Sequence, residues 1–408
     1  MPKWTQLLKG LLLGFFAAAI DNASLAVKNS MFAKRNVLDY AKNIRGWKTP
    51  RRIICFAVDD YGTVRTASTQ AWEQLDAAGL DVSSQMDRFD AVETRDDLVA
   101  LFEVLASVQD ARGQSAVFTA YALSANPDFE QIRADGECYR SETVPRTFER
   151  LATDQPAAYE GTWSLWQEGM AEGLIRPQFH GREHFNIELL EKKLASKSPD
   201  LLANLECSSM AGLGSEPTMP GISFTQAFGL HNKESLPAHR QTLEEGLNLF
   251  EQVWGFRSET FTPPAQKLHP SLYAVAEAGG VLSIDKPLRC ARPMGDGTSQ
   301  REFNRSGRQK GQGHVTVVRN VVFEPCKDMG FEPVSRALEQ IQAAFFWGRP
   351  AIISSHRVNF GGHLDETNRE RGLSALKRLL QDIVQRWPEV EFLSVDQLVR
   401  EMDGEVSR

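Results

Sequence analysis

Cysteine is scarce in this 408-residue sequence, and the few cysteines stand far apart. No two of them form a C-x-x-C pair, and their number is odd; they are Cys55, Cys138, Cys207, Cys290 and Cys326. An odd set of widely spaced thiols argues against a disulfide scaffold and against a structural zinc knuckle. The cysteine content therefore favours a reducing compartment.

A net positive charge is also absent. The formal net charge is -7 at pH 7. Because binding to nucleic acid requires a basic face that neutralises phosphates, nucleic acid is not expected as a partner. The charge is unevenly spread: residues 1–52 hold ten basic and two acidic side chains, so the rest of the chain carries -15. We therefore expect a basic N-terminal extension, residues 1–50, attached to an acidic body.

The extension lacks an apolar run long enough to cross a membrane. Its run Leu11–Ile20 has ten residues, about half of the roughly 20 that a spanning helix needs. Three interpretations stay open: a signal peptide, a basic amphipathic segment on an anionic membrane surface, or a helix packed on the body. We expect a cytoplasmic protein that associates peripherally with the membrane through this extension. Export through a signal peptide is the alternative.

From residue 51 onward, short apolar runs alternate with helical stretches. The expected strands are residues 53–58, 115–120, 177–179, 260–262, 281–284, 315–319, 351–355 and 391–394. The expected helices are residues 69–78, 95–108, 157–172, 187–195, 242–254, 270–278, 334–347 and 368–386. This alternation is typical of parallel strands covered by helices. It predicts an α/β fold with one barrel domain over residues 51–400, a tail at 401–408, and an open doubly wound sheet as the alternative.

Three long segments fit no simple strand–helix unit. Residues 137–156 and 208–236 are polar and rich in Gly, Pro and Ser, and residues 289–310 combine glycine with several arginines. We predict that the first two are loops above the barrel face that contact substrate. The third could bind a phosphate or an acidic glycan, or could be a solvated surface loop.

Two adjacent carboxylates, Asp59 and Asp60, follow the first expected strand and precede Tyr61 and Gly62. Side chains at the carboxyl end of a parallel strand point into the mouth where β/α active sites form. Neighbouring residues at a strand end diverge, so one carboxylate can bind a cation while the other acts as a base. The alternative is turn chemistry, with either Asp capping the next helix.

Two histidines four residues apart, His180 and His184, follow the strand at 177–179. This spacing can present two imidazoles to one ion, and Gly181 permits a tight turn between them. Arg182 and Glu183 are placed to orient the ligands or to bind substrate. The pattern is not H-E-x-x-H, because Glu183 directly precedes the second histidine, which disfavours a metalloprotease.

A further histidine, His356, ends the strand at 351–355 and is a candidate general acid. Arg357 could pair with a carboxylate that holds the site together, or bind an acidic group. The residues expected to contact substrate are Tyr61, Arg182, Glu183 and Arg357.

In this order, the motifs resemble those of the polysaccharide deacetylases of the glycoside hydrolase/deacetylase superfamily. They are the Asp pair, the H-x-x-x-H stretch, the proline-containing strand end at 261–264 and the late histidine. The sequence is more similar to uncharacterised bacterial deacetylase-like proteins associated with surface glycans. It shares with them residues 45–49, the F-H-G-R-E-H stretch and residues 353–359. The resemblance spans about residues 40–398.

The resemblance implies a distorted (β/α)7 barrel that binds one divalent metal ion, with zinc expected. Carried over by position, it makes Asp60, His180 and His184 the metal ligands, Asp59 the base and His356 the acid. The chain also departs from the family pattern. Tyr61 stands where the family has glycine, residues 261–264 lack the arginine of the R-x-P motif, and residues 283–286 show no D-x-x-D-W motif.

Three functions follow as hypotheses. The leading one is metal-dependent hydrolysis of an amide or ester on an acylated polysaccharide or glycan precursor, with a carbohydrate as the substrate. The second is a glycoside hydrolase that would use Asp59 with Glu183. The third is a non-catalytic glycan-binding or assembly component, favoured by the missing arginine and tryptophan motifs.

Overall fold

The computed structural model describes residues 35–136, 138–296, 298–309 and 311–404. The predictions of a signal peptide or membrane segment rest on residues 1–34 and lie outside the described residues. Residues 35–42 are helical and pack on the barrel, because Asp39 pairs with Arg336 at 2.6 Å. Among the described helices, none has both the length and the hydropathy required to cross a bilayer.

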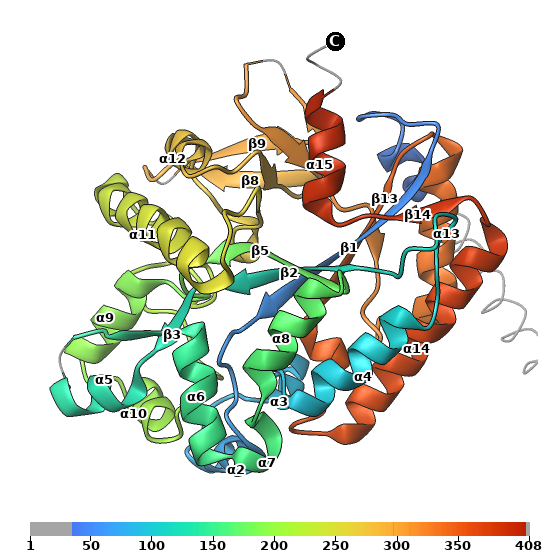
Figure 1. The fold of residues 1–408 in the computed structure, drawn as a ribbon. Helices are drawn as coiled ribbons and strands as arrows, with labels where there is room; N and C mark the ends of the chain where they lie inside the picture. Colours follow the sequence, from blue (N-terminus) through green and yellow to red (C-terminus); the bar gives the residue numbers. More distant parts are fainter. Residues whose placement is uncertain (1–34, 137, 297, 310, 405–408) are drawn as a thin grey trace, which may run out of the picture.

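A parallel sheet occupies the centre of the molecule and helices surround it (Figure 1). Its parallel strands are β1 (Arg52–Tyr61), β2 (Phe118–Leu123), β5 (Ile175–Gly181), β6 (Thr260–Phe261), β7 (Ser283–Asp285), β11 (Val315–Val317), β12 (Val321–Val322), β13 (Ala351–His356) and β14 (Val390–Phe392). The antiparallel strand β10 (Gly307–Arg308) pairs with β11. Two further antiparallel pairs are separate from this sheet: β3 (Ala125–Pro127) with β4 (Ser141–Thr143), and the hairpin of β8 (Arg289–Pro293) with β9 (Ser299–Phe303).

The strand order explains how the sheet curls into a distorted barrel. Neighbouring strands follow in the order β7, β6, β5, β2, β1, β13. The segment 315–322 joins the two ends, since β11 pairs with β7 while β12 pairs with β13. Residues 318–320 between them bend inward to place Arg319, so this seventh strand position is broken in the middle. The predicted fold class, a distorted (β/α)7-type barrel, is confirmed.

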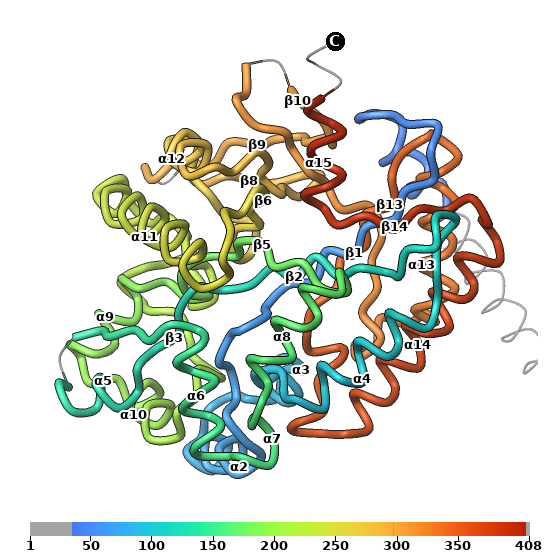
Figure 2. Tube along the Cα trace, in the orientation of Figure 1, coloured from blue at the N-terminus to red at the C-terminus, as the bar shows by residue number. Residues whose placement is uncertain are grey.

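The helices cover the outside of the strands (Figures 1 and 2). They are α2 (Thr69–Ala77), α3 (Gln85–Phe89), α4 (Arg95–Ala106), α5 (Phe129–Asp135), α6 (Val144–Asp154), α7 (Pro156–Tyr159), α8 (Thr162–Ala171), α9 (Ile187–Ala195), α10 (Pro199–Glu206), α11 (Leu236–Trp254), α12 (Tyr273–Ala278), α13 (Pro333–Phe346), α14 (Glu366–Arg386) and α15 (Val395–Gly404). Local signals fix their ends: Thr94 and Asp97 form a capping box on α4, and Gly255 ends α11 in the left-handed region.

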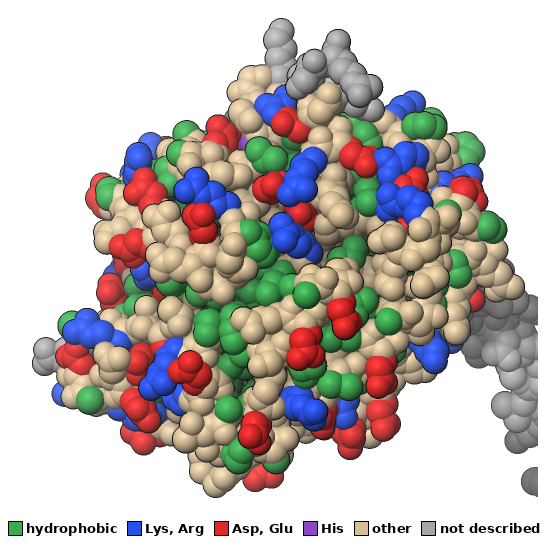
Figure 3. All heavy atoms as spheres, viewed as in Figure 1, with side chains coloured by type: hydrophobic (Ala, Val, Ile, Leu, Met, Phe, Trp, Pro, Cys, Tyr) green, Lys and Arg blue, Asp and Glu red, His purple; other side chains and the backbone are tan. Residues whose placement is uncertain are grey.

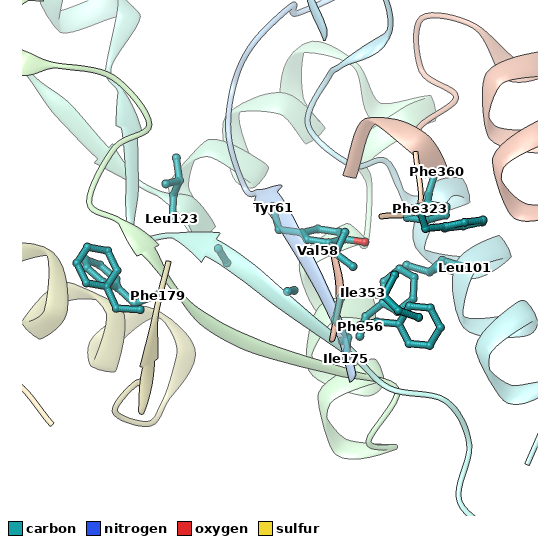
Figure 4. Packing of buried hydrophobic residues seen from close by; sticks show 14 of the residues in the cluster. Phe56, Val58, Tyr61, Leu101, Leu123, Ile175, Phe179, Phe323, Ile353 and Phe360 are labelled. Carbon is teal, nitrogen blue, oxygen red and sulfur yellow. The ribbon is translucent and has the colours of Figure 1, made fainter. Parts of the chain in front are cut away.

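Two cores flank the strands. Along β1, the even-numbered residues Ile54, Phe56 and Val58 pack outward against the helices, whereas Ile53, Cys55 and Ala57 face the barrel interior. Figure 4 shows Phe56 and Ile353 grouped with Leu101 of α4 on one side, and Phe179 apart from them near α11. On the face seen in Figure 3, hydrophobic side chains gather near the centre and charged ones lie around them. Because successive side chains of a strand point to opposite faces, the odd-numbered residues of β1 at 53–57 enter the barrel and the even-numbered ones at 54–58 pack against the helices.

The structure corrects three expectations about segments. Residues 144–154 form α6 within the stretch expected to be a loop. Residues 289–303 form the hairpin β8–β9. Residues 395–404 form α15, a helix that was not among the expected ones. Val395, Leu398 and Met402 of this helix pack against the side chains that face the barrel interior. Figure 2 shows the helix beside β10.

Candidate active site and metal centre

The two carboxylates of β1 diverge because the strand breaks its alternation between them. The side chain of Asp59 lies on the same face of β1 as that of Ala57, which faces the barrel interior. Asp59 pairs in register with His356 on β13. Asp60 adopts a φ of 78°, a conformation that few non-glycine residues take, and the pairing with β2 shifts register between Val58 and Tyr61. This bulge turns the Asp60 carboxylate away from Asp59 towards β5, so adjacent residues serve different partners.

Asp60 lies against both predicted histidine ligands. Its Oδ1 is 3.3 Å from Nε2 of His180 and 3.0 Å from Nε2 of His184. The three ligand atoms all lie within 4.8 Å of one another. Gly181 makes the turn between the histidines possible, since its φ is 144° and a Cβ there would meet the Glu183 carbonyl oxygen at 2.8 Å. The structure thus brings Asp60, His180 and His184 together as the sequence predicts.

The donor set fits a divalent cation. The Nδ1 of His180 lies 2.7 Å from the carbonyl oxygen of Thr262. A carbonyl only accepts, so Nδ1 donates this hydrogen bond and Nε2 is the ring nitrogen that faces the Asp60 oxygen. A cation or a proton between Nε2 and this oxygen would satisfy both atoms. Ligand atoms at tetrahedral angles around zinc lie roughly 3.3 Å apart, close to the spacing found.

The charges of these groups suit the same role. Burial by itself would raise the pKa of Asp60, but the nearby His184 and His180 hold it well below its usual range. Burial lowers the pKa of His184 despite its carboxylate neighbour. An ionised carboxylate and neutral imidazoles are the forms in which these residues ligate metals.

His356 lies across the mouth from the triad. Its Nδ1 is 2.5 Å from Oε1 of Glu324, and its Nε2 is 4.0 Å from Oδ2 of Asp59. Burial lowers the pKa of His356, but Glu324, Asp60 and Asp59 outweigh burial and raise it to about 9. The His356 side chain keeps 29% of its surface exposed. It is therefore a protonated imidazolium that a substrate can reach.

Arg319 fixes the Asp59 carboxylate. Its two terminal nitrogens each donate to one Asp59 oxygen at 2.7 Å, the bidentate geometry that only arginine offers. Its Nε donates to Asp285 at 2.5 Å, and Thr262 bridges Arg319 and Asp285. Burial opposes ionisation of Asp59, but Arg319 and the nearby histidines lower its pKa. Asp59 is thereby held as an oriented carboxylate.

Arg319, Asp285 and Glu324 are functional residues that the sequence reasoning missed. The arginine absent from residues 261–264 is supplied by the broken strand position at 318–320 instead. A signal was present: Arg319 ends the expected strand 315–319, and Asp285 directly follows the strand expected at 281–284. Charged residues at the carboxyl ends of parallel strands point to a site.

Two predicted substrate contacts, Tyr61 and Arg357, prove to be buried, which corrects that part of the prediction. Tyr61 is 1% exposed and packs edge-on against Trp166. Arg357 forms ion pairs with Asp90 at 2.8 Å and Glu93 at 2.9 Å, and Glu93 accepts from the Gly62 amide. Arg357 therefore supports the turn after Asp60, the first of the two roles expected for it.

Arg182 and Glu183 also pair with each other. Both Glu183 oxygens accept from Nε of Arg182, at 2.8 and 3.0 Å, and the Tyr139 hydroxyl donates to one of them at 3.0 Å. Glu183 is 1% exposed. The predicted substrate contact by Glu183 is therefore corrected: the pair braces the segment between the two histidines.

A scan against protein-family models finds no match, and a search of curated proteins finds none either. A search of solved structures finds 28 matching chains. One is a protein from Mycobacterium smegmatis assigned to the polysaccharide deacetylases, with 11% identity and a TM-score of 0.43, covering 88% of this chain and 93% of that one.

Two other matches differ in activity. A family 4 acetyl xylan esterase from Clostridium thermocellum is 10% identical, with a TM-score of 0.31, over 85% of this chain and 90% of that one. A GH57 branching enzyme from Thermococcus kodakaraensis is 12% identical, with a TM-score of 0.39, over 86% of this chain and 71% of that one. Esterases and glycan-remodelling enzymes both occur among the matches.

Proposed function

We propose that this protein hydrolyses an amide- or ester-linked acyl group on a carbohydrate in a reaction that depends on a divalent cation. The observation that carries the proposal is the convergence of two units at one barrel mouth. One is the ligand set of Asp60, His180 and His184, and the other is the pair Asp59 and His356 beside it. A ligand set next to a separate base and acid is the arrangement that hydrolysis of an acyl group requires.

Asp60, His180 and His184 would hold the cation, with zinc proposed because two imidazoles and one carboxylate suit it. A divalent cation at such a site polarises an acyl carbonyl and lowers the pKa of a bound water from about 16 towards 7 in the best zinc case. The Thr262 carbonyl orients the His180 ring, and the Arg357–Glu93 pair holds the turn that carries Asp60.

The remaining steps fall to the side chains around the ligand set. Asp59, oriented by Arg319, accepts a proton from the attacking water. His356, held protonated by Glu324, donates a proton to the departing amine or alcohol. Opposite protonation states in neighbouring groups are what an acid–base pair needs.

The two alternative functions lose their support from the site. A glycosidase would need Asp59 with Glu183, but Glu183 is only 1% exposed. The non-catalytic alternative was favoured by the missing arginine and tryptophan motifs, and Arg319 supplies an arginine to Asp59, so only the missing tryptophan motif still favours it.

Acetate release from a panel of N-acetyl and O-acetyl oligosaccharides tests the proposal. We expect release by zinc-loaded protein, none after chelation, and recovery on reloading. Asp59→Asn should lower kcat by roughly 10²- to 10⁴-fold, the contribution of a positioned base, and Asp76→Asn, at an exposed position of α2, should leave it unchanged. Equal release by metal-free and metal-loaded protein would refute the proposal.

A further inference from the structure

A small cavity lies outside the barrel mouth, between the end of β7, the start of α12 and the hairpin β8–β9. Its free volume is about 20 Å³, slightly more than one water molecule needs. Polar side chains from each of these elements line it; they are Lys286, Tyr273, Cys290, Arg292 and Glu302. The space accepts one small polar group and excludes a sugar ring.

Lys286 is a buried cation in this cavity that lacks a hydrogen-bond acceptor. The residue is 4% exposed, and within the described parts of the chain its Nζ has no hydrogen-bond partner. Its Nζ lies over the face of the Tyr273 ring, 4.1 Å from the ring centroid. An ammonium has three protons to donate, and burying them unpaired is unfavourable. Burial lowers the pKa of Lys286 to about 8, although the Glu302 carboxylate opposes this shift.

Arg292 is a second cation in the cavity, and it also has an N–H group without an acceptor among the described residues. Arg292 pairs with Glu302 at 3.1 Å and donates to the Tyr273 hydroxyl at 3.3 Å, yet its Nε has no partner among the described residues. The other Glu302 oxygen lies 3.7 Å from the Cys290 sulfur. The acid of the cavity is thus already engaged, and the nearby Glu277 and Asp285 pair with His314 and Arg319.

We propose that this cavity binds the carboxylate of a sugar acid between Lys286 Nζ and Arg292 Nε, with the sugar ring lying outside. A carboxylate is a suitable acceptor for both of these unused donors. Asp285 lines the cavity and also binds Arg319, so the bound sugar would lie beside the strand end that orients Asp59. That the sugar acid belongs to the substrate rests on the proposed function; the carboxylate site itself does not.

Calorimetric titration with galacturonate tests the site, with galactose as the neutral control. We expect galacturonate to bind and galactose to bind more weakly. Lys286→Met should weaken galacturonate binding by roughly 10- to 100-fold, the range for losing hydrogen bonds from a charged group. Lys377→Met, at an exposed position of α14, is the control and should change it little. Unaltered galacturonate binding by correctly folded Lys286→Met protein would overturn the proposal.

Further ligands and variants distinguish a sugar-acid site from a free-anion site and from failure of the proposed function. Acetate and phosphate test whether the sugar ring contributes to binding. For a sugar-acid site we expect them to bind at least about tenfold more weakly than galacturonate; equal affinity would assign the cavity to a free anion and overturn the proposal. If Lys286→Met fails to fold, Arg292→Gln replaces it with the same expectation. Asp60→Asn protein, which cannot complete the metal site, should still bind galacturonate, so a failed binding test and a failed hydrolysis test remain distinguishable.

Discussion

Arg319 is the residue on which the charge balance of the site depends. It is buried and binds Asp59 and Asp285 at once. Arg319→Met would leave two buried carboxylates without a counter-charge, so we expect a loss of roughly 3–5 kcal/mol in the free energy of unfolding, together with loss of acyl hydrolysis. Urea denaturation and acetate release measure the two effects.

The controls for this variant are chosen by geometry. Arg319→Lys keeps the charge but not the two-pronged contact, so its effects should be intermediate. Arg95→Met alters an exposed arginine and should change little. Arg319→Met protein as stable as the parent would contradict this account of the site.

His356 should act on the leaving group. For a sugar amide, His356→Gln should lower kcat by roughly 10²- to 10⁴-fold. For an aryl ester, whose leaving group departs without a proton, the loss should be much smaller. His363→Gln changes a histidine that binds the Ala67 carbonyl and serves as the control. Equal losses on both substrates would show that His356 does not act as the acid.

At the scale of elements, helix α14 sets the position of the segment after His356. A Cβ added at Gly372 would lie 1.7 Å from the Asn359 carbonyl oxygen, and Asn359 donates to Glu324, the partner of His356. We expect Gly372→Ala to cost roughly 1–3 kcal/mol from overpacking, against the gain of about 1 kcal/mol that alanine brings to a helix interior, and to lower activity as well.

Thermal and urea denaturation of Gly372→Ala measure this cost. Gly404→Ala is the matched control, because a Cβ on that helical glycine meets nothing within 4 Å. Unchanged stability of Gly372→Ala would contradict the close packing of α14 on the segment 357–360.

The parts of the fold and site that could be predicted are those that depend on residues close together in the sequence. The strands were predictable because apolar β-branched runs ended at turn residues, and the ligands because Asp60, His180 and His184 directly follow such runs. The role of Arg319 could not be predicted, because its partner Asp59 lies 260 residues away in the sequence and only the folded barrel brings the two together. Helix α15 was missed because its apolar face is stabilised by the barrel interior, which no local pattern reveals.

At the scale of the whole molecule, the barrel gathers residues from distant strands at one mouth. β1 contributes Asp59 and Asp60, β5 and the following turn contribute the histidines, and β13 contributes His356. The broken strand 315–322 closes the ring and supplies Arg319. The central claim is therefore that this mouth is a cation site built for acyl hydrolysis.

Metal content by elemental analysis tests that claim most directly. Protein purified without chelators should contain about one equivalent of a divalent metal, as expected for a single mononuclear site. The double variant His180→Ala/His184→Ala should contain none, and His363→Gln should match the parent. No metal in the parent protein after reloading with zinc, or equal metal in parent and double variant, would contradict the account.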